Sequence, residues 1–192
     1  MATPVFSRIL MLLFRPDAAW SGIAGERVTL DGLLRMWILP FSLIAPVMLA
    51  IGVTVFDQAW NSALGYRVLP RGIYPVVLTT FLSSVAAVFM LAAIFSWIAP
   101  AFGPKPGFMP ALKVAVFGSV PVWVASALLF LMPMIIVVLF AFLYSCYLYY
   151  VGASKMLGIA ADRAAEFVAV SMLLLSLALM LAGAAGSWIG LI

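Results

Sequence analysis

The sequence predicts an all-α, polytopic integral membrane protein: a bundle of five transmembrane helices with a short N-terminal segment of interfacial helices. The 192 residues are 67% hydrophobic and only 8% charged, whereas an ordinary soluble domain has about 25% charged residues. The apolar runs are continuous instead of alternating, which indicates helices and not a β-barrel. One uncharged stretch, Val114 to Ser154, suits two membrane crossings of about 20 residues each.

Residues 1–35 form the predicted N-terminal segment, and its first part has a helical pattern. Thr3 and Pro4 suit a helix start, and apolar residues then recur at helical spacing at Val5, Phe6, Ile9, Leu10 and Leu13, with Arg8 off this stripe. About ten residues are too few to cross a bilayer. The helix therefore lies in the membrane interface or packs against the bundle, and the sequence leaves both open.

A second short helix is predicted from Pro16 and Asp17, which suit the first turn of a helix. Trp20 falls on one side of it, and Gly25 is expected to end it. Neither helix has the basic region and cleavage site of a signal peptide.

Residues 36–192 form the predicted membrane domain, with spans at about 36–56, 73–99, 114–132, 134–154 and 167–190. Pro40 and Pro46 are expected to kink the first span. Residues 100–110 are rich in proline and glycine and predict a loop. Pro133 predicts the turn of a hairpin between spans three and four, with Lys113 and Lys155 at its two ends on one membrane face. A polar connector is expected before span five, carrying Asp162, Arg163 and Glu166.

The basic residues support this count of spans. Eight of them fall on one side of the five-span arrangement: Arg8, Arg15, Arg27, Arg35, Lys105, Lys113, Lys155 and Arg163. Only Arg67 and Arg71 fall on the other side. Because basic loops favour the cytoplasm, we expect a cytoplasmic N-terminus and a C-terminus in the opposite, periplasmic or external, compartment.

Residues for catalysis and for cofactors are scarce. The chain has no histidine and one cysteine, Cys146, so a zinc, haem or iron–sulfur site is not expected, and no other cofactor or metal is predicted. Nucleophilic catalysis would need Lys, Asp or Glu as its base, and no predicted span carries a charge. The scattered basic residues also give no nucleic-acid patch. We therefore expect a protein that is not an enzyme and has no catalytic residues.

Two sets of polar or small residues inside the spans suggest other roles. Pro40, Pro46 and Pro121 could break their helices, and hydroxyl groups could line a polar cavity at Thr80, Ser83, Ser119 and Tyr144. The alternative is that the hydroxyls bond to their own helices and the prolines only bend them. Small residues at a spacing of four allow close helix contact within the chain or in a homo-oligomer; these are Ala182, Gly186 and Gly190.

Several short motifs resemble the bacterial Yip-domain family, relatives of the eukaryotic Ypt/Rab-interacting membrane proteins. Phe14-Arg15-Pro16 followed by Trp20 and Ile23 is similar to the opening of that domain, and Val116 to Pro121 with the later Leu131-Met132-Pro133 is similar to its third span and hairpin. The resemblance covers most of the chain from Phe6 onward and implies five spans with a cytoplasmic N-terminus. The predicted binding residues are Arg15, Pro16, Asp17, Trp20, Phe117 and Pro121, and the segment around Arg15, Asp17 and Trp20 is the expected cytoplasmic recognition surface.

The sequence departs from the eukaryotic members in its first span and in its short N-terminal segment. Met36 to Pro40 keeps only the proline of their motif, so a Rab GTPase is not an expected partner. The short loops and compact length indicate a bacterial inner-membrane protein. The first functional hypothesis is a non-enzymatic scaffold that binds membrane lipids, a membrane or cytoplasmic protein, or both. The alternative is a small transporter or channel with the hydroxyl- and proline-lined path.

Overall fold

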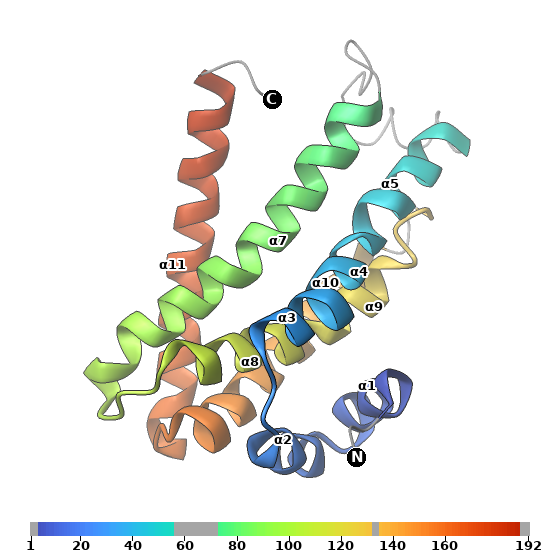
Figure 1. Cartoon of the computed structure of the whole chain (residues 1–192). Helices are drawn as coiled ribbons and strands as arrows, with labels where there is room; N and C mark the ends of the chain where they lie inside the picture. Colours follow the sequence, from blue (N-terminus) through green and yellow to red (C-terminus); the bar gives the residue numbers. More distant parts are fainter. Residues whose placement is uncertain (1–3, 56–72, 132–134, 189–192) are drawn as a thin grey trace.

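The fold of the chain is known from a computed structural model that describes residues 4–55, 73–131 and 135–188. Within these ranges the protein is helical, and five helical segments are long and apolar enough to cross a membrane (Figure 1). They run Leu30–Val55, Ile73–Phe102, Phe108–Ser126, Ile135–Leu157 and Ala161–Ala184. The all-α, five-span prediction is confirmed, and the ends of several spans differ from the prediction.

Two short helices precede the spans, as predicted. They are α1, Val5–Phe14, and α2, Pro16–Gly25. Pro16 is at the start of α2 with Asp17 in its first turn, where a fixed φ angle and a negative charge favour a helix N-terminus. An extended linker from Glu26 then leads to Thr29, whose hydroxyl accepts a hydrogen bond from the Gly32 amide and caps the next helix.

The first span begins at Leu30, earlier than the predicted residue 36, because Thr29 already supplies a helix cap. It consists of α3, Leu30–Leu33, a π-helical turn η1, Leu34–Ile38, then α4, Leu39–Ser42, and α5, Ile44–Val55. Pro40 is the second residue of α4, two residues after the end of the π-helical turn. Its missing amide hydrogen accounts for a change of hydrogen-bond pattern at this place.

The second and third spans are joined more tightly than predicted. Helix α7, Ile73–Ile98, continues as a 3-10 turn η2, Ala99–Phe102, and α8, Phe108–Gly118, begins inside the predicted loop. Pro110 is the third residue of α8, where a helix needs no amide donor, so proline does not oppose it. Lys113 therefore lies within a helix and not in a loop, and its position at the membrane face next to span three stays a prediction.

The hairpin and the last span also differ at their ends. After Ser119, α9 covers Val120–Ser126, followed by tight turns, and α10, Ile135–Gly152, continues as a π-helical turn η4, Ala153–Leu157. The turn predicted at Pro133 lies outside the described residues. The last helix, α11, spans Ala161–Trp188, so Asp162, Arg163 and Glu166 belong to its first turns and not to a connector.

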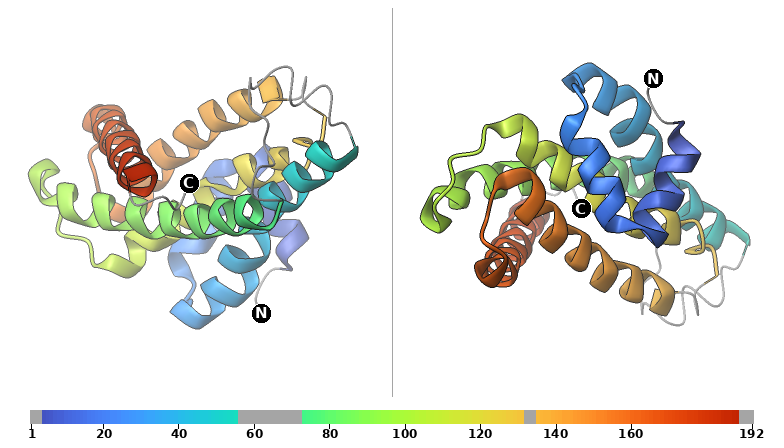
Figure 2. Two further views of the ribbon diagram at one scale, coloured as in Figure 1. Left: turned by 90° about the horizontal axis from the view of Figure 1, so that it is seen from above. Right: turned by 90° about the horizontal axis from the view of Figure 1, so that it is seen from below.

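The five spans pack around α8, which has the most buried span of the bundle. Helices α7 and α10 contact it directly, and α11 contacts α7 and α10. Figure 1 shows α7 and α11 close at one end and diverging toward the other, and Figure 2 shows the same bundle from both ends. Helices α1 and α2 lie at the end where α7 joins α8.

We call this end of the bundle the basic side. The segments that the distribution of basic residues assigned to one side of the membrane meet here. The guanidinium of Arg163 lies 4.7 Å from the ring centre of Phe102, and Phe102 also contacts the Phe167 ring at 5.4 Å. Lys155 reaches Asp17 in α2. The N-terminal helices and the ends of spans two to five therefore meet on one side.

Candidate functional site

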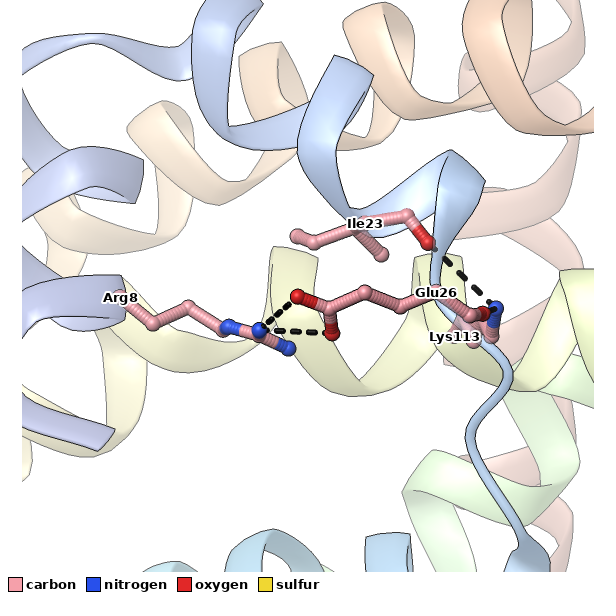
Figure 3. A network of polar contacts seen from close by, with 4 residues as sticks. All are labelled: Arg8, Ile23, Glu26 and Lys113. Atoms are coloured by element: carbon pink, nitrogen blue, oxygen red, sulfur yellow. Dashed lines mark hydrogen bonds and ion pairs between the residues drawn. The ribbon is translucent and has the colours of Figure 1, made fainter. Parts of the chain in front are cut away.

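The N-terminal helices are fixed to the bundle by a network of charged groups (Figure 3). An Arg8 guanidinium nitrogen in α1 donates to both carboxylate oxygens of Glu26, at 2.5 and 2.6 Å. The Lys113 ammonium in α8 donates to the Glu26 backbone carbonyl at 2.5 Å and lies 3.4 Å from that of Ile23. Glu26 thus connects α1, the end of α2 and the third span.

The two basic side chains of this network are buried, so their charges depend on the polar partners that the network supplies. Arg8 and Lys113 are each only 7% exposed, and a buried charge is stable when it has close polar partners. Lys113 also lies beside the last carbonyls of α2, where a cation complements the helix dipole. The network therefore ties the N-terminal segment to α8 through interactions that neither segment could form alone.

Phe117 lies beneath the network at the centre of an aromatic cluster. The Arg8 guanidinium carbon is 5.4 Å from its ring centre, within the range of a cation–π interaction. Trp37 of η1 contacts Phe117 edge to face at 5.0 Å, and Trp20 of α2 does so at 6.5 Å. Phe117 thus joins the first span, both N-terminal helices and α8 in one core.

Helix α2 packs closely on the fourth span because Gly152 has no side chain. A Cβ atom at this position would lie 2.8 Å from the Trp20 ring, which is too close for an ordinary contact. Trp20 is fully buried, and its indole nitrogen has no hydrogen-bond partner among the described residues. Its contribution here is packing.

Two further contacts hold the segment along α10 and η4. The Tyr144 hydroxyl donates to the Leu13 carbonyl at 2.8 Å and to the Leu12 carbonyl at 3.2 Å, which satisfies groups at the end of α1. The Lys155 ammonium contacts the Asp17 carboxylate at 2.9 Å and the Asp17 carbonyl at 3.0 Å.

The predicted binding residues separate into an exposed and a buried group. Arg15 and Asp17 are exposed, and Pro16 is half-buried at the start of α2. Trp20, Phe117 and Pro121 are buried. The prediction that Trp20 lies on a recognition surface is therefore wrong, because its ring fills the space beside Gly152; the binding role of Arg15 and Asp17 stays a prediction.

The hydroxyl groups predicted to line a cavity have different surroundings. The Ser119 hydroxyl donates to the Ala115 carbonyl at 2.7 Å and lies 2.8 Å from that of Tyr149, whereas Tyr144 binds α1. Thr80 is half-buried and Ser83 is exposed on α7. Ser119 and Tyr144 thus have partners within the protein, and a path shared by the four hydroxyl groups stays a prediction.

The predicted helix contact lies at the end of α11. Ala182 is exposed, Gly186 is in the last turns of the helix, and Gly190 lies outside the described residues. No packing within the described chain covers Ala182, and its role in an oligomer stays a prediction.

Four of the six acids each have their own basic partner. Glu26 binds Arg8, Asp17 binds Lys155, and two exposed pairs form within helices, at Asp31 with Arg35 and at Glu166 with Arg163. No group of three or more potential metal ligands occurs among the residues that the structure describes.

Sequence reasoning missed Arg8, Glu26 and Lys113 as a set. The one signal for them is that a charged residue in so apolar a chain needs a partner. Lys113 stands between Leu112 and Val114, and its partners are separated from it by 87 and 90 residues. Spacing along the sequence cannot identify such a contact.

The family model described as the Yip1 domain matches residues 10–183, from within α1 to near the end of α11. No curated protein and no solved structure has a significant match to the chain.

Proposed function

Because the chain belongs to the Yip1-domain family, we propose that this multi-pass membrane protein is a non-enzymatic scaffold that binds membrane lipids and partner proteins. The observation that carries the proposal is the charged network of Arg8, Glu26 and Lys113. It holds α1 and α2 in one place on the bundle. A surface held in this way loses less conformational entropy on binding than a free N-terminal tail would.

The outer face of the docked segment has the character of a binding surface. Arg15, Asp17 and Ala18 are exposed at the start of α2, and Ser21 and Ala24 continue the exposed face along that helix. Small side chains permit a close approach by another protein. The segment thus offers an exposed face of small and polar side chains.

Unpaired basic residues give the same side an affinity for anionic groups. Arg15, Arg27 and Lys105 are exposed and form no ion pair with any residue that the structure describes. A basic residue near a membrane surface contributes about 1 kcal/mol of attraction to anionic lipid. We infer that the basic side faces the cytoplasm of a bacterial inner membrane, since basic residues favour that side.

Photo-cross-linking in intact cells tests this function. A benzophenone amino acid at the exposed position Ala18 is expected to form discrete adducts with a protein or a phospholipid. The matched control is the same group at Leu173, which is exposed in the middle of α11 and should react only with bulk lipid. Identical products at the two positions would contradict the proposal that the α2 face is the binding surface.

A further inference from the structure

Helix α1 has an unusual distribution of polar and apolar side chains. Its charged residue Arg8 faces the bundle together with Leu12, and both are buried. Its large apolar residues Phe6, Leu10 and Phe14 are 71%, 40% and 78% exposed. A spacing of four places these three on one face. A surface helix in water has the opposite arrangement, with its apolar side inward.

The orientation of α1 is fixed by its inner contacts. Arg8 is held by the Glu26 carboxylate, and the carbonyls of Leu12 and Leu13 accept from the Tyr144 hydroxyl. Turning the apolar face inward would break these bonds and leave Arg8 without the partner that allows its burial. The outward apolar face is therefore a consequence of the fold.

The position of α1 identifies what covers this face. Tyr144 lies within a membrane-spanning segment, 11 residues before Lys155, which is about 16 Å along an α-helix. The same span exposes Phe140, Leu143 and Tyr147 by 65%, 58% and 44%. Because α1 ends against the flank of this span, its apolar face continues a surface that the bilayer covers.

We propose that α1 is embedded in the membrane leaflet on the basic side, with Phe6, Leu10 and Phe14 among phospholipid acyl chains. The inference rests on the proposed function in one respect, that the N-terminal segment binds lipid, and it specifies the acyl chains as the partner of α1. The segment then contributes apolar volume to one leaflet only, whereas the five spans contribute to both.

Spin-label accessibility in lipid nanodiscs tests this position. Cys146 is the only cysteine, so Cys146→Ala gives a background for single labels at Leu10→Cys and Phe14→Cys. Leu173→Cys on α11 is the lipid-facing control, and Lys105→Cys in the exposed connection before α8 is the aqueous control. Collisions with oxygen report lipid, and collisions with a nickel chelate report water.

We expect the labels on α1 to collide with oxygen as often as the label at position 173, and several-fold less often with nickel than the label at position 105. Nickel collisions equal to those of the aqueous control would place α1 in water and overturn the inference. Protection from both agents would also overturn it, because a protein partner or second copy would then cover the face.

The two controls also separate this inference from the proposed function. A label at position 173 that reports lipid shows that the bundle is folded on the Cys146→Ala background. Adducts at Ala18 together with nickel-accessible α1 would leave the scaffold function standing and refute only the insertion. An α1 inserted in lipid without a specific adduct at Ala18 would support the insertion and refute the proposed function.

Discussion

The Arg8–Glu26 contact should determine how firmly the N-terminal segment is held. In Glu26→Gln the carboxylate is lost while the backbone carbonyl that binds Lys113 remains. Removing one partner of a buried ion pair costs about 3–5 kcal/mol, and an exposed pair contributes about 0–1 kcal/mol. The side chains here are 8% and 31% exposed, so we expect a cost of about 2 kcal/mol for local opening.

Hydrogen exchange of the protein in lipid nanodiscs measures this opening. A cost of about 2 kcal/mol corresponds to about 30-fold faster exchange for amides of α1 and α2, with little change in α7 or α10. The matched control is Arg35→Gln, which removes an exposed pair with Asp31 and should change the exchange rates by less than about twofold.

A double-mutant cycle with Arg8→Gln isolates the pair itself. If Arg8 and Glu26 act together, the double variant should open no more easily than the more affected single variant, because each single change already removes the contact. Additive effects of the two changes, or an effect of Glu26→Gln as small as that of the control, would refute the assignment of this contact as the main attachment.

Three other changes test the packing and the weaker attachments. Gly118→Ala would place a Cβ atom 2.3 Å from the Tyr149 ring, and forced overpacking should lower the stability of the bundle by about 1–3 kcal/mol, measured as a lower unfolding midpoint in detergent; an unchanged midpoint would contradict the close packing of Tyr149 on Gly118. Tyr144→Phe removes the hydrogen bonds to the end of α1 and should speed exchange in α1 about fivefold, from a loss of about 1 kcal/mol; unchanged exchange would show that these bonds contribute nothing. Lys155→Met should loosen the start of α2 by less than about 1 kcal/mol, because the partner Asp17 is 73% exposed. This effect should shrink at high salt, and an effect independent of salt would argue against an ion pair.

The spans were predictable because continuous apolar runs leave helices as the main choice for a chain in lipid. Their ends were less predictable. Asp162 and Glu166 are polar enough to suggest a connector, yet they belong to the first turns of α11. Pro110 suggests a loop, yet proline is tolerated in the first turn of a helix. Local composition does not distinguish these cases.

The N-terminal segment shows a second limit of sequence reasoning. The ends of α1 and α2 follow from local signals at Pro16 and Gly25. The inward face of α1 does not follow from local signals. A helix on a protein surface in water turns its apolar side toward the protein, whereas α1 exposes its large apolar side chains. The partners of Arg8 and Lys113 come from segments distant in sequence, and only the three-dimensional arrangement brings them together.

The central claim is that the docked N-terminal segment is the surface that binds lipids or partner proteins. Native mass spectrometry of protein released from nanodiscs containing anionic and zwitterionic phospholipid tests it most directly. We expect the unaltered chain to retain an anionic lipid or a protein, and the Arg15→Gln, Arg27→Gln double variant to retain at least fivefold less, while Arg35→Gln behaves as the unaltered chain. Equal retention by all three proteins would contradict the claim.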